Sequence, residues 1–117
     1  MSKIVHVDDL DHYFRLINHE RRLVMVDFSA SWCGPCKQLF PTLEKLSQER
    51  ESELLILKVD ADHDKSLDED AQLMPLFEVE GLPTLVFIKD KMMVSGNDYR
   101  IEGLDLRKLD RAVKKLL

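Results

Sequence analysis

Residues 26–37 read VDFSASWCGPCK, and this stretch decides the fold. It begins inside an almost wholly apolar run, Leu23–Phe28, which predicts a central strand covered on both faces. After the two cysteines, leucines recur at helical spacing over residues 39–46. The sequence therefore predicts that a buried strand passes into a long helix through a turn that holds Cys33 and Cys36.

The place of Cys33 at the start of this helix favours thiol chemistry. Free N–H groups and the dipole at a helix N-terminus stabilise an anion, so a cysteine there is more acidic than a free one. The thiolate is the species that attacks in disulfide exchange. We expect Cys33, in the turn, to be exposed and to attack. We expect Cys36, one turn further in, to be less exposed and to resolve the mixed disulfide.

The close cysteine pair has two other interpretations, a structural staple and a metal site. A bridge that closes so short a loop removes little entropy from the unfolded chain, which weakens the staple. A tetrahedral zinc site needs more ligands, and the chain has no third cysteine. Its histidines, which form no pair at zinc-binding spacing, are His6, His12, His19 and His63. An intramolecular metal site is disfavoured, a metal shared between two chains stays open, and Lys37 stands where haem attachment requires histidine.

The composition is that of a small acidic globular domain. The 117 residues are 44% hydrophobic and 33% charged, and we expect one domain over residues 1–117. The net charge of −5 disfavours nucleic acid or an anionic membrane as a partner. No apolar run approaches the ~18 residues that span a bilayer. The first residues lead into charge rather than into the apolar core of a secretory signal, so we expect a cytoplasmic protein.

Predicted strands alternate with predicted helices along the first part of the chain, and two consecutive strands and a helix follow. This order predicts an α/β fold. The expected strands are Ile4–Val7, Leu23–Phe28, Leu54–Val59, Thr84–Ile88 and Met92–Ser95. The expected helices cover residues 10–17, 32–48 after an initial loop, and 106–116, and a further helix is expected within residues 66–77, where Pro75 leaves its C-terminal end open. We expect the first strands to be parallel and the last two to form an antiparallel edge hairpin around Asp90 and Lys91. Pro41 should kink the second helix, because it lacks a donor N–H and clashes with the preceding turn.

The cysteine segment resembles the active-site segment of the thioredoxin family, and further landmarks extend the resemblance over essentially the whole chain. In order, these landmarks are residues 26–37, Pro41, Lys58–Asp60, residues 81–84 (GLPT) and Gly103. The resemblance implies the thioredoxin fold, a central mixed sheet of about five strands flanked by about four helices. It also implies that the two cysteines form a redox-active disulfide.

The resemblance assigns roles to two residues behind the cysteines. Asp27 would be the buried carboxylate that accepts the proton of Cys36, and burial would raise its pKa toward the working pH. Lys58 would lie near Asp27 and modulate its charge. Taken without the resemblance, an ordinary exposed lysine at a strand end explains Lys58 equally well.

The resemblance also implies a substrate-docking surface beside the thiols. Pro83 would follow a cis peptide bond and face the cysteines, and the Leu82 backbone would pair with an extended substrate segment. The other members of this surface would be Trp32, Gly81 and Gly103.

Gly34 and Pro35, between the cysteines, would tune the redox chemistry. Pro35 supplies neither an N–H nor a charge, whereas oxidase-like members of the superfamily commonly carry histidine there. Without that positive partner the thiolate is stabilised less, and the dithiol is more strongly reducing. We therefore expect a protein-disulfide reductase, an electron carrier that contributes to cell redox homeostasis, rather than an isomerase or oxidase.

The resemblance implies disulfide-containing proteins as substrates and a separate reductase, in this family usually an NADPH-dependent flavoprotein, that reduces the disulfide again. No G-x-G-x-x-G loop occurs, and we expect a monomer with no bound cofactor. Two segments, residues 60–83 and 89–103, are longer than in typical small members of the family. The first opens with the acidic run Asp60–Asp70, which motivates an alternative, a thioredoxin-fold adaptor subunit of a larger complex with secondary redox activity.

Overall fold

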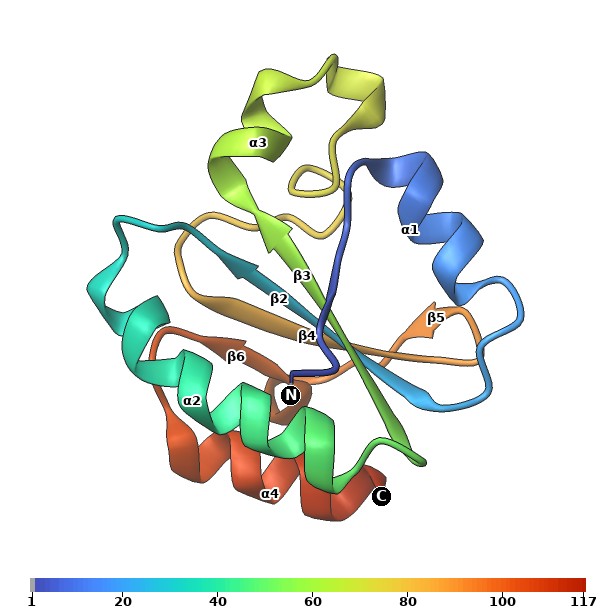
Figure 1. The fold of residues 1–117 in the computed structure, drawn as a ribbon, viewed down its shortest axis with the longest axis vertical. Coiled ribbons are helices and arrows are strands. Elements are labelled where there is room, and N and C mark those ends of the chain that lie inside the picture. Colours follow the sequence, from blue (N-terminus) through green and yellow to red (C-terminus); the bar gives the residue numbers. More distant parts are fainter. Residues whose placement is uncertain (1) are drawn as a thin grey trace.

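Six strands form one mixed sheet in the structure, a computed structural model that describes residues 2–117 (Figure 1). The strands are β1 (Val5–His6), β2 (Leu23–Ser29), β3 (Leu54–Asp60), β4 (Thr84–Lys89), β5 (Met92–Met93) and β6 (Arg100–Glu102). The helices are α1 (Leu10–Ile17), α2 (Gly34–Glu49), α3 (Ala61–Ser66) and α4 (Leu106–Leu116), with short 3-10 helices η1 (Glu69–Ala71) and η2 (Asn97–Tyr99). The expected α/β architecture is confirmed.

The order of strands across the sheet is β1-β3-β2-β4-β5, and β6 also pairs with β4. Both β1 and β2 run parallel to β3, whereas β4 runs antiparallel to β2, β5 and β6. The parallel first strands and the antiparallel hairpin are thus confirmed. Every residue of β2 is buried, because this strand lies in the centre with both faces covered.

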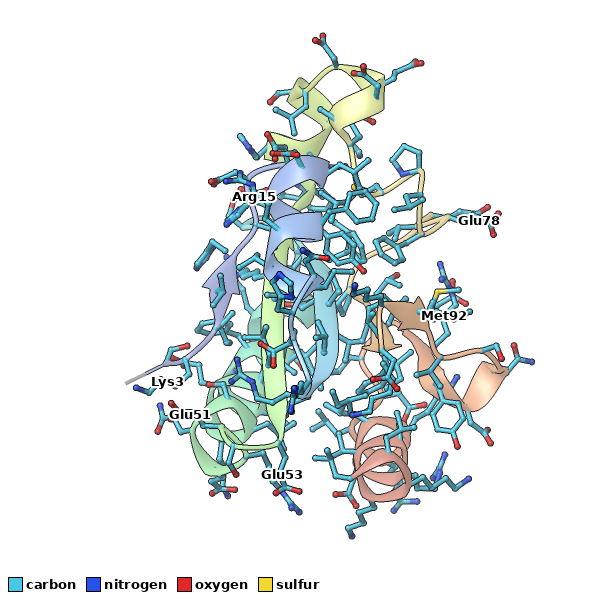
Figure 2. The ribbon with its side chains drawn as sticks, turned by 90° about the vertical axis from the view of Figure 1, so that its right-hand side faces the viewer. Lys3, Arg15, Glu51, Glu53, Glu78 and Met92 are labelled. Carbon is cyan, nitrogen blue, oxygen red and sulfur yellow. A yellow bond between two sulfur atoms is a disulfide. The ribbon has the colours of Figure 1, made fainter. Side chains whose placement is uncertain are left out.

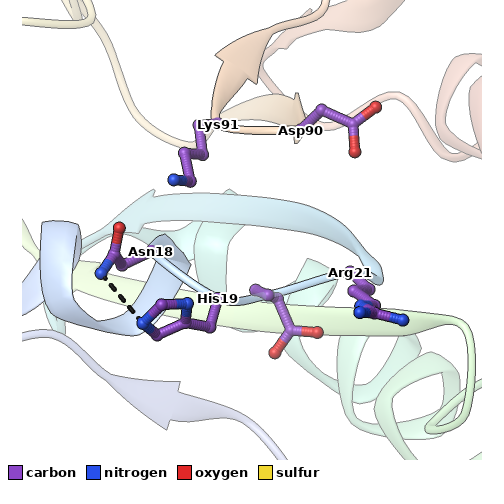
Figure 3. Close-up of a pocket in the computed structure, with 6 residues that line it drawn as sticks. Asn18, His19, Arg21, Asp90 and Lys91 are labelled. Atoms are coloured by element: carbon purple, nitrogen blue, oxygen red, sulfur yellow. Dashed lines mark hydrogen bonds between the residues drawn. The ribbon is translucent and has the colours of Figure 1, made fainter.

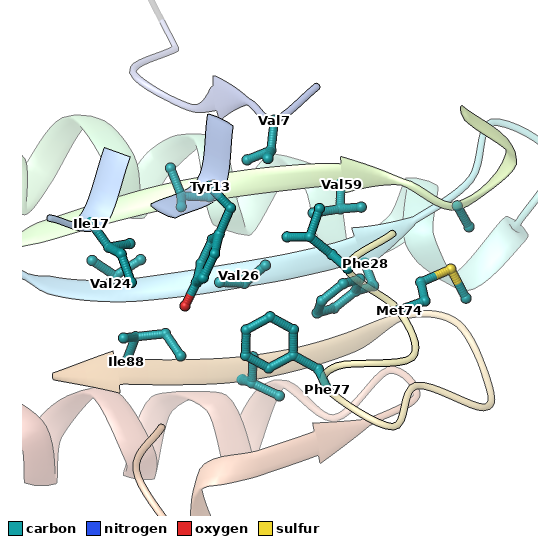
Figure 4. Close-up of a cluster of buried hydrophobic side chains, with 14 of the residues drawn as sticks. Val7, Tyr13, Ile17, Val24, Val26, Phe28, Val59, Met74, Phe77 and Ile88 are labelled. Atoms are coloured by element: carbon teal, nitrogen blue, oxygen red, sulfur yellow. The ribbon is translucent and has the colours of Figure 1, made fainter. Parts of the chain in front are cut away.

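Helices cover the two faces of the sheet over separate apolar clusters. Side chains alternate along β2, so Met25 packs in the cluster beneath α2 and α4, and Val26 packs in the cluster beneath α1. In the α1 cluster the Phe77 ring contacts the rings of Tyr13 and Phe28, at centroid distances of 5.5 and 5.6 Å (Figure 4). These contacts hold both α1 and the chain before β4 against the sheet.

Asp side chains begin two of the long helical segments. The Asp9 carboxylate accepts the N–H of His12 at 2.8 Å and starts α1. The Asp105 carboxylate accepts the N–H of Lys108 at 3.0 Å and starts α4. The second helix, α2, continues through Pro41 to its end, and the kink expected at Pro41 stays a prediction.

Within residues 66–77 the structure forms only the short 3-10 helix η1, rather than the longer helix that the pattern predicts. An α-helix does form before this segment, but α3 ends where the expected helix should begin. It starts early because the Asp60 carboxylate accepts the N–H of Asp62 at 3.0 Å, and so caps a helix directly at the end of β3. The chain after α3 forms only turns and η1.

A buried carboxylate explains why residues 66–77 do not form a helix. Asp64 is fully buried, and its two oxygens accept the N–H groups of Leu73 at 2.8 Å and Met74 at 3.0 Å. These N–H groups bind a side chain rather than the carbonyls of a preceding helical turn. Asp64 therefore folds the segment back over α3.

The chain between residues 89 and 103 also differs from expectation. Asp90 and Lys91 form the expected turn, both with positive φ (51° and 69°), as a two-residue hairpin requires. However, β5 is shorter than the strand expected over residues 92–95. The short strand β6 was not predicted, because three residues are too few to show an alternating pattern.

Charged side chains surround this core (Figure 2). Lys3 and Glu51, for example, form an exposed ion pair with 3.9 Å between Nζ and Oε1. Met92 projects outward from β5 at the sheet edge. Among residues 2–117 no helix combines the length and the apolar character that crossing a membrane requires.

Candidate active site

The two cysteines lie where β2 passes into α2, as predicted. Cys33 is the N-cap of α2, in an extended backbone conformation, and its Sγ accepts the N–H of Cys36 at 3.2 Å. Pro35 occupies the first turn, where a missing N–H costs no helical hydrogen bond. Cys33 and Cys36 form a disulfide, with 5.2 Å between their Cα atoms. The Cys33 sulfur is thus placed where a helix N-terminus stabilises negative charge.

The prediction that Cys33 is more exposed than Cys36 is wrong. Cys33 is 5% exposed and Cys36 is 7% exposed, so neither is the more accessible residue in the disulfide form. The reason is that the Cys33 sulfur turns inward over the first turn of α2, where it bonds both Cys36 Sγ and the Cys36 N–H. Both cysteines belong to the apolar cluster on the α1 face, and Leu82 packs against the same cluster.

Asp27 is buried within β2, with 3% of its surface exposed. It follows Met25 by two residues on β2 and therefore points to the α2 face of the sheet. Its Oδ1 and the Ser29 hydroxyl both lack a hydrogen-bond partner within residues 2–117. Burial raises the pKa of Asp27 from 3.8 to about 6. The positive charge of Lys58 opposes this shift, and so does the dipole of the Ser29 hydroxyl, which is near but makes no hydrogen bond of acceptable geometry.

Lys58 lies directly opposite Asp27 in the parallel pairing of β2 with β3. Its side chain leaves the same face of the sheet, because Leu54 and Ile56, at alternate positions before it, pack beneath α2. The Lys58 ammonium lies 4.6 Å from the centre of the Phe40 ring. The structure therefore brings Lys58 beside Asp27, as predicted, without a direct ion pair between them.

A cavity of about 200 Å³ opens next to Cys36 and Lys58. Its lining residues, which come from the end of β2, the start of α2 and β3, are Ala30, Ser31, Cys36, Lys37, Phe40 and Lys58. Phe40 was not among the predicted site residues. Its position four residues after Cys36 is the signal that could have found it, since such residues share one face of a helix.

The structure also brings together the predicted residues that are distant in sequence. The peptide bond between Leu82 and Pro83 is cis, as predicted. The Gly103 N–H donates to the Pro83 carbonyl at 2.8 Å, which places Gly103 beside Pro83. The Thr84 hydroxyl donates to the Gly81 carbonyl at 2.6 Å and closes the turn before the proline.

Trp32 stands beside the disulfide as an exposed aromatic side chain. It is 65% exposed, and its Nε1–H donates to Asp62 Oδ2 at 2.9 Å. Asp62 was not predicted as a site residue. The parallel pairing of Ser29 with Asp60 could have found it, because Trp32 and Asp62 follow the ends of these two adjacent strands.

A larger surface hollow, of about 320 Å³, lies away from this chemistry (Figure 3). It is bordered by the loop after α1 and by the hairpin turn, through Asn18, His19, Arg21, Asp90 and Lys91. Arg21 precedes β2, whereas the cysteines follow it, so the hollow and the disulfide belong to opposite ends of this strand. No cysteine lines it, and it takes no part in the thiol site.

A comparison with protein families matches residues 4–115 to the thioredoxin family. The chain belongs to the thioredoxin family. Thioredoxin H-type 1 of Nicotiana tabacum is 34% identical over 109 residues, which cover 93% of this chain and 78% of that protein. Thioredoxin-T of Drosophila melanogaster is 42% identical over 82 residues, which cover 70% of this chain but 47% of that longer protein.

Solved structures confirm the thioredoxin fold. The X-ray structure of Fasciola hepatica thioredoxin superposes with a TM-score of 0.80 at 33% identity. The match covers 97% of this chain and 99% of that one. Membership of the thioredoxin family, together with the disulfide at the start of α2, makes this chain a thiol–disulfide oxidoreductase. Thioredoxins carry no prosthetic group, and their redox group is the cysteine pair itself.

Proposed function

We propose that this thioredoxin is a protein-disulfide reductase. The observation that carries the proposal is the Cys33–Cys36 disulfide at the N-terminus of α2. In the reduced protein, the Cys33 thiolate attacks a substrate disulfide, forms a mixed disulfide and displaces one substrate thiolate. The Cys36 thiolate then attacks Cys33 Sγ and displaces the second substrate thiolate. The two electrons that reduce the substrate come from the dithiol, which ends as the Cys33–Cys36 disulfide.

The helix N-terminus supports the choice of Cys33 as the attacking thiol. The N–H of Cys36 already points at the Cys33 sulfur, and the dipole of a long helix lies behind it. Both stabilise the Cys33 thiolate over the thiol. Cys36, inside the first turn, has no such position and becomes the resolving thiol.

Asp27 is proposed as the proton acceptor for Cys36. Its pKa of about 6 leaves it ionised near neutral pH, yet close enough to that pH to take up a proton. Its Oδ1 is buried on the α2 face of the sheet without a hydrogen-bond partner among residues 2–117, and Lys58 modulates its charge. A water would carry the proton from Cys36 to Asp27, since Cys36 lines the cavity described above and Asp27 does not.

Substrate docks beside the disulfide on a mixed apolar and backbone surface. Trp32 offers an exposed ring, and the turn around the cis Leu82–Pro83 bond offers backbone groups for an extended segment. Gly81 and Gly103, which flank this turn, leave room for a substrate backbone because no side chain projects from either. Gly34, beside Cys33, is likewise uncrowded.

Pro35 favours reduction of substrates over their oxidation, since it gives the thiolate no charged partner. We further propose that the oxidised protein is reduced again by an NADPH-dependent flavoprotein. The protein would then serve redox homeostasis as a monomeric electron carrier in the cytoplasm. The acidic balance of the chain, with its net charge of −5, agrees with protein substrates rather than nucleic acid or a membrane surface.

Reduction of a model protein disulfide tests the proposed function. The native protein and Cys33→Ser are compared with dithiothreitol as electron donor, and we expect the variant to lose catalysis almost completely, since it lacks the attacking thiol. Ser52→Ala, which removes an exposed hydroxyl before β3 at the opposite end of the sheet, serves as the control. Equal rates for the native protein and Cys33→Ser would contradict reductase function and would favour the adaptor alternative.

A further inference from the structure

The Phe40 ring covers the Lys58 ammonium at the wall of the cavity beside Cys36. The distance from Lys58 Nζ to the ring centroid is 4.6 Å, within the range of a cation–π interaction. Both side chains are half-buried, so the contact is neither fully solvated nor inaccessible. Lysine is a long, flexible side chain that otherwise extends its ammonium into water.

This contact restrains the ammonium of the residue that lies opposite Asp27 in the sheet. Lys58 is the register partner of Asp27, yet the two do not form an ion pair within 4.0 Å. The ammonium nevertheless opposes the rise in the pKa of Asp27 from its place on the ring. A lysine free in solvent would spend its time further from the carboxylate and oppose that rise less.

We propose that Phe40 is a positioning residue, which holds the Lys58 ammonium at a fixed distance from Asp27. Phe40 contacts no reacting atom in this arrangement and acts through Lys58. The inference rests on the proposed role of Asp27 as proton acceptor. It adds the side chain that sets the electrostatic field at that acceptor.

The other titratable residues on the elements next to Asp27 are exposed or carry no charge. On α2, Cys36 is bound in the disulfide and has no thiol to titrate, and Lys37 is exposed. On β3, Asp60 lies two residues beyond Lys58, is exposed and is already engaged in capping α3. The register partner of Asp27 on β4 is Leu85, which has no charge. Lys58 is thus the charged neighbour of Asp27, and its ammonium contacts the Phe40 ring.

The test measures the pKa of Asp27 by carboxyl carbon NMR in the disulfide form, where no Cys36 thiol complicates the titration. We expect Phe40→Leu to raise this pKa by about half a pH unit, since the ammonium loses its restraint. Lys58→Gln should raise it further, and Phe40→Leu should add nothing in the Lys58→Gln background. Phe40→Tyr, which keeps the aromatic face, should restore the native value.

Two further measurements separate positioning from a general structural effect. Phe14→Leu removes an exposed aromatic ring on α1 and should leave the pKa of Asp27 unchanged. In the native protein the ε-methylene protons of Lys58 should be shifted upfield by the ring current, unlike those of Lys37. This readout needs no variant and holds even where a substitution destabilises the fold.

The inference would be overturned if the NMR resonance of the Lys58 ε-methylene protons showed no upfield shift. It would also be overturned if the pKa of Asp27 in Phe40→Leu were equal to the native value or lower. An equal rise on adding Phe40→Leu to Lys58→Gln would also overturn it, because Phe40 would then act without Lys58. None of these measurements depends on turnover. Failure of the proposed function would instead appear as disulfide reduction that survives the loss of Cys33.

Discussion

At the scale of the residue, chemistry is set by burial and by contacts with the helix start. The sequence was sufficient to predict the cysteine pair, Asp27 and the cis bond before Pro83, because each belongs to a short and specific motif. It did not reveal Phe40, since an aromatic residue on an apolar helix is ordinary core material until its partner is known. Nor did it show that Cys33 is turned inward in the disulfide, which depends on the direction of one side chain.

Asp27 should weaken the fold at neutral pH. Its pKa is about 6 in the folded protein against 3.8 ordinarily, so the folded state binds more protons between these values. The free energy of unfolding therefore falls as pH rises from about 4 to about 6, and stays lower above that range. The rise in the pKa of Asp27 from 3.8 to about 6 corresponds to roughly 3 kcal/mol in the free energy of unfolding.

Asp27→Asn removes this cost, because an amide carries no charge to bury. We expect the oxidised variant to be more stable than the native protein by roughly 2–3 kcal/mol at pH 7.5, and by little at pH 4. Urea unfolding at both pH values measures the difference. A stability gain of the same size at pH 4 and pH 7.5 would show that ionisation of Asp27 is not its cause.

At the scale of the element, long apolar or amphipathic segments were predictable and short or side-chain-bound ones were not. The central strands and α4 follow from sustained patterns of burial. The segment over residues 66–77 has a helical composition, but the Asp64 carboxylate captures its backbone N–H groups. Such a long-range contact between side chain and backbone leaves no periodic trace in the sequence.

Asp64 should therefore be essential to the turn after α3. Asp64→Ala leaves two buried N–H groups, those of Leu73 and Met74, without acceptors, and we expect a loss of roughly 2–4 kcal/mol in the free energy of unfolding. Asp64→Asn, which keeps one acceptor oxygen, should lose less. Asp68→Ala is the control, since Asp68 makes no capping hydrogen bond at η1. Similar losses for Asp64→Ala and Asp68→Ala would refute this account.

At the scale of the whole molecule, the fold gathers the site at one end of the sheet. The strands β2 and β3 end side by side (Figure 1). The disulfide, Trp32 and Asp62 follow those ends in the sequence, and Trp32 donates a hydrogen bond to Asp62. The Pro83 turn comes to the same end because β4 runs antiparallel to β2 and starts there, with Thr84 opposite Phe28. The strand order thus brings together residues from three separate parts of the chain.

The most direct test of the central claim is to identify the cysteine that bonds to substrate. Reduced Cys36→Ser is mixed with an oxidised model protein, and the covalent complex is digested and mapped by mass spectrometry. We predict a stable mixed disulfide at Cys33, because the resolving thiol is absent. We also predict that Cys33→Ser, treated in the same way, traps far less. Trapping by Cys36 in Cys33→Ser at an equal or greater yield would contradict the account.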